Sequence, residues 1–275
     1  ASITSELLRR IAAYGPHMTR AVAVAAELDC LISLAMAARE MHYVRPVLTH
    51  DNVLHIKQGR HMLTEMTVEG CYVPNDTAMD ENGKRVQVIT GPNFAGKSLD
   101  TVKQVGLIVF LAHIGSFVPA EAATIGLTDR IFTRIASQDS LAVPQSTFMI
   151  DLSQMSTMLR YGMHRSLCII DEFGKGTLTT DGVGLLCAAL RHFSCALAPP
   201  KVLACTHFSE YPRRCPQLTF LTMDILADPN KSSAEQDKVV FLYRVVPGYA
   251  APSFGVHCAK LAGLKADILQ RAVQV

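Results

Sequence analysis

The sequence lacks the patterns that mark several common classes of protein. Its 275 residues contain no run of about 18 apolar residues, which argues against a membrane-spanning segment. Residues 1–6 lack the charged and apolar stretches of a secretory signal, and the chain begins with Ala rather than Met, so we expect a fragment of a longer protein. The net charge is only +2, so no overall basic field indicates nucleic-acid binding.

Zinc-binding patterns are absent as well. None of the eight cysteines forms a C-x-x-C pair, and the ten histidines include no H-E-x-x-H motif. Cys168, Cys187 and Cys205 lie in apolar runs, where a thiol behaves as a small hydrophobic side chain. We therefore expect a reducing, intracellular compartment. The 49% hydrophobic and 18% charged residues are typical of a globular chain with a sizeable core.

Residues 86–98 carry the most informative pattern that is present. They read as a short apolar strand, a loop and the start of a helix, and the loop fits G-x-x-x-x-G-K-[ST]. Glycines let such a loop fold around an anion, and its N–H groups and the helix N-terminus face the phosphates. The lysine supplies charge to the β- and γ-phosphates, and the serine hydroxyl supplies a ligand to Mg²⁺. The predicted nucleotide-binding residues of this loop are Gly91, Pro92, Asn93, Phe94, Ala95, Gly96, Lys97 and Ser98.

A second element of the predicted site is an acid pair that directly follows the apolar strand predicted at residues 166–170. Asp171 is expected to bind Mg²⁺ together with Ser98, and Glu172 to polarise the attacking water as a general base. An acid pair after any strand could instead cap a turn or a helix, but the phosphate loop in the same chain favours the nucleotide site. The glycine-containing segment 173–182 is typical of a loop that approaches another backbone closely.

Strands and helices alternate from residue 86 onward, with a helix predicted at residues 147–158 and a further strand at residues 201–205, and the strands are apolar on both faces. This pattern predicts a buried, largely parallel sheet between helices. Residues 1–45 are predicted as two helices, the first capped by Ser5, with a break at Gly15 and an end at Arg45 before a proline. The apolar stripe of the second helix favours a core or connecting helix over a coiled coil. Residues 80–84 are predicted as a hairpin tip, and residues 228–237 as a surface loop.

Several short motifs occur in a fixed order along the chain, at residues 91–98, 114–120, 129–135, 146–149, 171–177 and 205–208. Together they closely resemble the MutS family of DNA mismatch-repair ATPases over essentially the whole chain. The resemblance implies an α/β fold of the ABC-type P-loop NTPase class, with a mostly parallel central sheet flanked by helices. It also implies two parts, the end of a helical lever domain at residues 1–45 and an ATPase domain at residues 46–275.

The resemblance assigns roles to further residues. Asn93 would position the γ-phosphate and its attacking water, and His207 would sense the γ-phosphate, so that both join Glu172 as catalytic residues. Tyr72 and Tyr243 would flank the adenine, although a tyrosine considered alone is more often a packing residue. The expected trans-acting signature, which would contact the nucleotide of a partner subunit, consists of Ser146 and Thr147.

Phe173 and Lys175, in the segment after the acid pair, most resemble the meiotic fifth MutS homologue. That resemblance implies a nuclear, ATP-driven dimer switch that binds ATP or ADP with Mg²⁺. It would pair with the meiotic fourth homologue and act at recombination junctions during crossover formation, through DNA-binding regions outside these residues and without a membrane.

Three alternatives remain. A mismatch-repair MutS subunit should carry an upstream Phe-x-Glu, and a structural module would bind ATP without significant hydrolysis. An ABC transporter or chromosome-organising ATPase should carry a Leu-Ser-Gly-Gly-Gln-like segment, which is missing from this sequence.

Overall fold

The computed structural model of the chain describes residues 2–68, 70–80, 85–91, 101–135, 146–208, 218–226, 240–249 and 255–274. The helices are α1 (Ile3–Ala12), α2 (Gly15–Glu40), α3 (Met62–Thr67), α4 (Lys103–His113), α5 (Thr147–Tyr161), α6 (Thr179–Cys195), α7 (Gly255–Leu261) and α8 (Ala266–Gln274). The strands are β1 (Val47–Thr49), β2 (Leu54–Gly59), β3 (Asn75–Met79), β4 (Val86–Thr90), β5 (Ala122–Gly126), β6 (Ile131–Arg134), β7 (Leu167–Asp171), β8 (Lys201–Cys205), β9 (Leu218–Leu226) and β10 (Val240–Pro247).

The strands form two sheets. A six-stranded sheet has the order β10-β9-β4-β8-β7-β6, in which β9, β4, β8, β7 and β6 are parallel neighbours and β10 is antiparallel to β9. A four-stranded sheet has the order β1-β5-β2-β3 and contains both parallel and antiparallel pairs. The fold is therefore mixed α/β, and the second sheet was not part of the sequence prediction.

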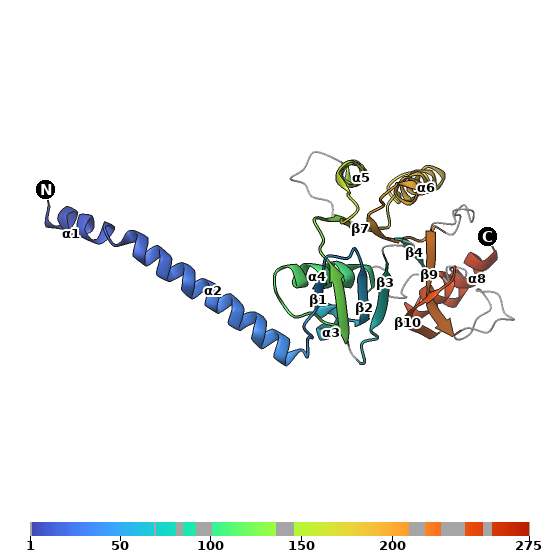
Figure 1. Cartoon of the computed structure of the whole chain (residues 1–275). Helices are drawn as coiled ribbons and strands as arrows, with labels where there is room; N and C mark the ends of the chain where they lie inside the picture. The colour runs from blue at the N-terminus through green and yellow to red at the C-terminus, as the bar shows by residue number, and fades with distance from the viewer. Residues whose placement is uncertain are drawn as a thin grey trace.

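Both faces of the six-stranded sheet are buried. In β7, Leu167 and Ile169 join a hydrophobic cluster that includes α4 and the four-stranded sheet. Cys168 and Ile170 point to the opposite face and join a cluster with α5 and α6. In Figure 1, α5 and α6 lie side by side beyond this second face, and α4 lies on the other side. Burial of both faces explains why the strand sequences are apolar without alternation.

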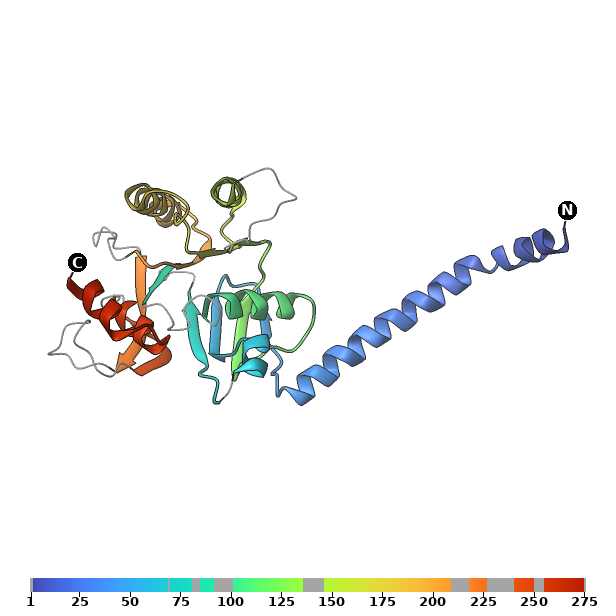
Figure 2. The same ribbon diagram turned by 180° about the vertical axis from the view of Figure 1, so that it is seen from behind.

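The two N-terminal helices form an arm that extends from the rest of the molecule (Figures 1 and 2). Side chains of α2 are exposed, and only Ala38 is buried in the described residues. Among the described helices, α2 alone is long and apolar enough to cross a membrane by those two criteria. Of the two expected roles of its apolar stripe, core packing is not observed in the described residues, because Leu28 and Leu31 are exposed, and the connecting role stays a prediction.

The bounds of the arm also differ from the prediction. Ser2, not Ser5, is the N-cap of α1, and its side chain accepts a hydrogen bond from the amide of Ser5. The helix α2 ends at Glu40, five residues before Arg45, and His42 follows with a φ of 51°. A left-handed residue at this position ends the helix before the proline restriction can act.

Arg60, the residue that follows β2, connects the arm to the four-stranded sheet through hydrogen bonds. Its Nη2 donates to the carbonyl of Met41 at 3.0 Å, and its Nε donates to Oε2 of Glu65 at 3.0 Å. Val44 and Val118 form an isolated antiparallel bridge beside it. The end of α2 is therefore held by polar contacts from the four-stranded sheet and its loops.

One predicted turn connects different sheets instead of paired strands. Residues 80–84 were expected at a hairpin tip, but β3 belongs to the four-stranded sheet and β4 to the six-stranded sheet. The polar segment was mistaken for a hairpin because polar turn residues occur equally in both kinds of connection. Residues 81–84 and the predicted surface loop 228–237 lie outside the described residues.

Candidate functional site

The carboxyl ends of β4, β8 and β7 meet at one edge of the six-stranded sheet. Ile89 of β4 pairs with Cys205 of β8, and Cys205 pairs with Asp171 of β7, so the three residues form one row across the sheet. Neighbouring strands lie about 4.8 Å apart, which separates β4 from β7 by roughly 10 Å. Gly91, the first residue of the predicted phosphate loop, follows β4 and so lies at the same edge as Asp171.

The backbone at Gly91 suits glycine. Its φ is 155°, and a Cβ at this position would lie 3.1 Å from Cγ of Met223. The rest of the loop lies outside the described residues, so its assignments stay predictions. These residues are Pro92, Asn93, Phe94, Ala95, Gly96, Lys97 and Ser98.

Asp171 presents an unsatisfied carboxylate at the sheet edge. Asp171 is 5% exposed, and its Oδ1 has no hydrogen-bond partner among the described residues. A buried carboxylate oxygen without a partner is costly unless a cation or donor completes it. Within the part of the chain that the structure describes, no cluster of three or more His, Cys, Asp or Glu residues could bind a metal. A single carboxylate with phosphate oxygens and waters is a donor set that suits Mg²⁺.

Glu172 follows at the same edge with an unusual backbone conformation. Its φ is 55°, a left-handed value that is rare for a residue with a side chain, and its N–H donates to the carbonyl of Cys205 at 2.9 Å. One carboxylate oxygen, Oε1, contacts Nε2 of His207, and the other, Oε2, accepts from Nζ of Lys175. The structure thus brings the predicted base and the predicted γ-phosphate sensor into direct contact.

The charge environment keeps Glu172 ionised. Burial raises the pKa of this carboxyl, but the hydrogen bonds and charges of His207 and Lys175 outweigh it and lower the pKa to about 2. Both carboxylate oxygens already have a partner in this conformation. Each carboxylate oxygen can accept more than one hydrogen bond, so Glu172 keeps acceptor capacity for an attacking water.

Glycines bring the segment after the acid pair against its neighbours. Gly174 has a φ of 94°, and a Cβ on Gly182 would lie 2.2 Å from the carbonyl oxygen of Gly174. A Cβ on Gly176 would lie 3.0 Å from Cβ of Phe148 in α5. The segment therefore folds closely on itself and against a side chain of α5, while the expected approach to another backbone stays a prediction.

The two tyrosines predicted to flank adenine are joined through Asn75. The side chain of Asn75 donates to the carbonyl of Tyr243 at 2.9 Å and accepts from the amide of Val245 at 2.7 Å. It also donates to the carbonyl of Val73, the neighbour of Tyr72, at 3.4 Å. Residues 171 positions apart in the sequence are thereby brought to one region, as a shared base site requires.

Each tyrosine has a distinct setting. The hydroxyl of Tyr72 accepts from the amide of His61 at 3.0 Å and donates to Oε1 of Gln104 at 3.1 Å, so this ring is anchored to α4. Tyr243 lies where the pairing of β10 with β9 shifts register, has a φ of 54° and is 38% exposed. A bulge of this kind redirects a side chain away from the regular pleat.

Ser146 is the N-cap of α5, and its Oγ accepts from the amide of Met149 at 3.3 Å. Ser146 is exposed and Thr147, the first residue of α5, is half-buried. The exposed position of Ser146 is compatible with a contact to another subunit, but the trans-acting role of both residues stays a prediction.

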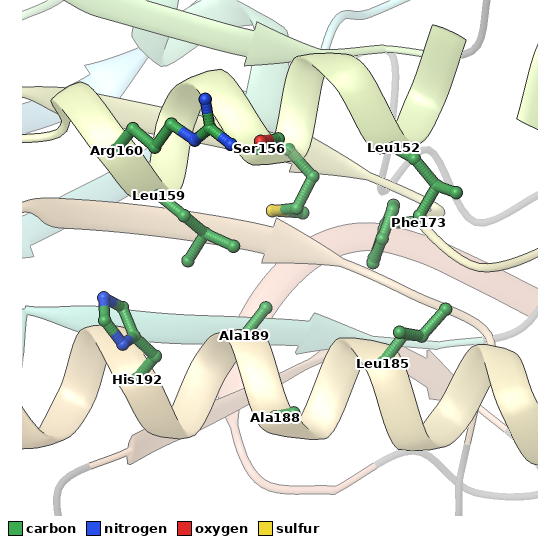
Figure 3. A pocket seen from close by; sticks show the side chains of 10 residues that line it. Leu152, Ser156, Leu159, Arg160, Phe173, Leu185, Ala188, Ala189 and His192 are labelled. Carbon is green, nitrogen blue, oxygen red and sulfur yellow. The ribbon is translucent and has the colours of Figure 1, made fainter. Parts of the chain in front are cut away.

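A separate cavity of about 470 Å³ lies between α5 and α6 (Figure 3). Its lining is mainly apolar, and Phe173, the residue after Glu172, points into it from the end of β7. Arg160 and His192 lie toward one end of the cavity. None of the described residues that line it carries a carboxylate, so its chemistry does not suit a magnesium-bound triphosphate.

Sequence reasoning missed several residues that shape the site. Lys175 was noticed only as a subfamily marker, although its ammonium pairs with Glu172. Asn75 was not singled out, because a short polar residue near a strand end gives no distinctive signal. Arg134 and Asp151 form a buried ion pair beside Asp171. A charge inside an apolar strand pattern could have drawn attention to Arg134.

Comparisons with known proteins agree with the geometry. The sequence profile of MutS domain V matches residues 87–275. The chain is 42% identical over 277 residues to the DNA mismatch repair protein MutS of Carboxydothermus hydrogenoformans, covering 99% of this chain and 31% of that protein. It is 39% identical to the DNA mismatch repair protein MutS of Roseiflexus castenholzii, covering 98% of this chain and 24% of the relative. The DNA mismatch repair protein MutS of Methanococcoides burtonii is also 39% identical, and the match covers 98% of this chain and 30% of that relative.

Proposed function

Because the chain belongs to the MutS family through its match to domain V, we propose that it is the ATP-hydrolysing part of a MutS-type DNA clamp. The chain spans less than a third of the length of these relatives, so the DNA-binding activity of the whole protein is part of the proposal. The observation that supports it is the row of strand ends, because Gly91 and the acid pair Asp171 and Glu172 lie at the same edge of the sheet.

In this proposal ATP lies at the edge formed by β4, β8 and β7. Mg²⁺ would be bound by Asp171 and Ser98, and it would neutralise charge on the phosphates. Glu172 would accept a proton from the attacking water. The unpartnered Oδ1 of Asp171 supports this assignment, because a cation would satisfy it.

We also propose that ATP acts as a switch between two subunits. The γ-phosphate would contact the phosphate loop of one subunit and the Ser146 segment of the other. A ligand shifts a conformational equilibrium only through such differential contacts. Residues 1–45 would then be the end of a lever that transmits the change, and residues 46–275 the ATPase domain. The exposed apolar surface of α2 supports a connecting role for the arm.

The DNA target is proposed at two levels. The relatives named above support a subunit that acts in mismatch repair. Phe173 and Lys175 support the more specific proposal of a nuclear, meiotic clamp that pairs with the fourth homologue and acts at recombination junctions. Binding of the full-length protein to a mismatched duplex and to a four-way junction, at fixed salt, distinguishes the two.

The catalytic proposal is tested by ATP binding and turnover in the full chain and its variants. Lys97→Ala should abolish ATP-dependent clamp formation, because it removes the charge that contacts the β- and γ-phosphates. Normal ATP loading by this variant would refute the assignment of the phosphate loop. In a dimer with one altered subunit, Ser146→Ala should slow turnover in the partner's site, and an equal loss in its own site would refute the trans arrangement.

A further inference from the structure

Arg134 is a buried cation beside the proposed metal site. It ends β6 and is 3% exposed. Its Nη1 donates to the backbone carbonyl of Asp171, and its Nη2 donates to Oδ2 of Asp151. Asp151 is buried as well. The planar guanidinium therefore joins two acceptors from different elements in one fixed geometry.

This connection attaches α5 to the peptide that carries the proposed Mg²⁺ ligand. Asp151 lies in the second turn of α5, the helix that begins after Ser146. The first turn has a second attachment, because Phe148 packs against Gly176 in the segment that follows Glu172. A movement of the beginning of α5 would therefore reach Asp171 through the ion pair and the Glu172 segment through the aromatic contact.

A cavity beside α5 offers space for such a movement. The cavity of about 470 Å³ separates part of α5 from α6, with Leu159 and Leu185 on facing walls (Figure 3). Close-packed interiors resist displacement, whereas a helix beside a cavity of this size can shift with less loss of contact. The contacts through Arg134 are a polar link between α5 and the sheet, in addition to the apolar packing of Met155 and Met158 on β7.

We propose that Arg134 is a positioning residue for the magnesium site. Through its ion pair with Asp151, it makes the orientation of the Asp171 carboxylate depend on the position of α5. The inference rests on the proposed ATPase function. It adds a route by which contact at Ser146 in one subunit alters metal binding in that same subunit. Arg134 acts through Asp171 and touches neither nucleotide nor metal itself.

The test compares Mg²⁺ binding in the wild-type chain and in Arg134→Lys. A fluorescent ATP analogue is titrated first in EDTA and then at increasing Mg²⁺ concentrations. Lysine keeps the buried charge but lacks the planar fork that joins Asp171 to Asp151. Removal of an outer partner of a metal ligand typically weakens metal binding about 10- to 100-fold, so the half-saturating Mg²⁺ concentration should rise by that factor. Affinity for the analogue in EDTA should stay within about twofold.

Lys201→Met is the matched control, because it removes a buried cation from the first residue of β8, at the end of the sheet remote from Asp171. This control should leave the half-saturating Mg²⁺ concentration unchanged. Asp151→Asn, which keeps the side-chain shape, should raise that concentration, and the double variant should add little because both changes break one link.

A half-saturating Mg²⁺ concentration unchanged in folded Arg134→Lys would overturn the inference. If Arg134→Lys does not fold, an unchanged half-saturating Mg²⁺ concentration in Asp151→Asn would overturn the inference. An equal rise in Lys201→Met would also do so, because the effect would then follow from lost stability. Failure of the wild-type chain to bind the analogue with Mg²⁺ would instead refute the proposed function.

Discussion

Gly182→Ala offers a sharp test of how the loop after the acid pair is built. An added Cβ would lie 2.2 Å from the carbonyl oxygen of Gly174 and 3.2 Å from Cζ of Phe208. The first of these contacts is with backbone, so a side-chain rotation cannot relieve it. Gly174 would have to move, and Glu172 lies only two residues before it.

Two opposing effects determine how much Gly182→Ala changes the free energy of unfolding. Overpacking in a close contact costs about 1–3 kcal/mol. Replacing glycine by alanine within a helix gains about 0.5–1 kcal/mol, because alanine loses less conformational entropy. The net expectation is a loss of about 1–2 kcal/mol in the free energy of unfolding. Turnover should fall as well, because the displaced loop carries Glu172 away from the sheet edge.

Gly184→Ala is the matched control in the same helix, α6. A Cβ at Gly184 would have no atom within 4 Å, so this variant should gain about 0.5–1 kcal/mol and keep its turnover. Urea denaturation with ATP hydrolysis measured on the same samples checks both expectations. If Gly182→Ala were as stable and as active as Gly184→Ala, the reasoning about backbone contact would be refuted.

Three further predictions concern charge and stacking. Glu172→Gln should retain ATP binding and lose about 100- to 10,000-fold in turnover, and undiminished turnover would rule out a general base here. Burial, followed by the charges of neighbouring arginines, lowers the pKa of Lys201 to about 8, so wild type should gain stability relative to Lys201→Met as pH rises from about 8 to 10.5. Parallel pH profiles in urea denaturation would contradict this. Tyr72→Ala should weaken ATP binding by about 1–3 kcal/mol, whereas Tyr72→Phe keeps the ring and should bind within about twofold in equilibrium titrations. Equal losses in the two variants would exclude stacking.

The sequence predicts several strands of the six-stranded sheet because these strands carry strong local signals, but it gives no prediction for β9. The strand at residues 201–205 is confirmed with the same bounds, and the strand at 166–170 is shifted by one residue. Both are short apolar runs followed by a polar residue, a pattern that is distinctive when both faces are buried. The predicted helix at residues 147–158 begins as expected and continues to Tyr161.

The rest depends on tertiary contacts that local patterns do not record. Nothing in the neighbourhood of Asn75 indicates that it will connect with β10, because the partner lies 168 residues away at Tyr243. The pairing of Glu172 with His207 likewise follows from the adjacency of β7 and β8. Sequence motifs identified which residues gather at the sheet edge, while the backbone strain at Glu172 and the pair of Arg134 with Asp151 became visible only in the fold.

The attachment of the N-terminal arm has a mechanical consequence. The helix α2 has 26 residues and is therefore roughly 39 Å long at 1.5 Å per residue. A tilt of about 5° at its Met41 end displaces its Gly15 end by roughly 3 Å, because the helix behaves as a stiff rod over this length. Slight adjustments around Arg60 are thus magnified with distance, and a sub-ångström change at the base becomes a displacement larger than a bond length at the tip.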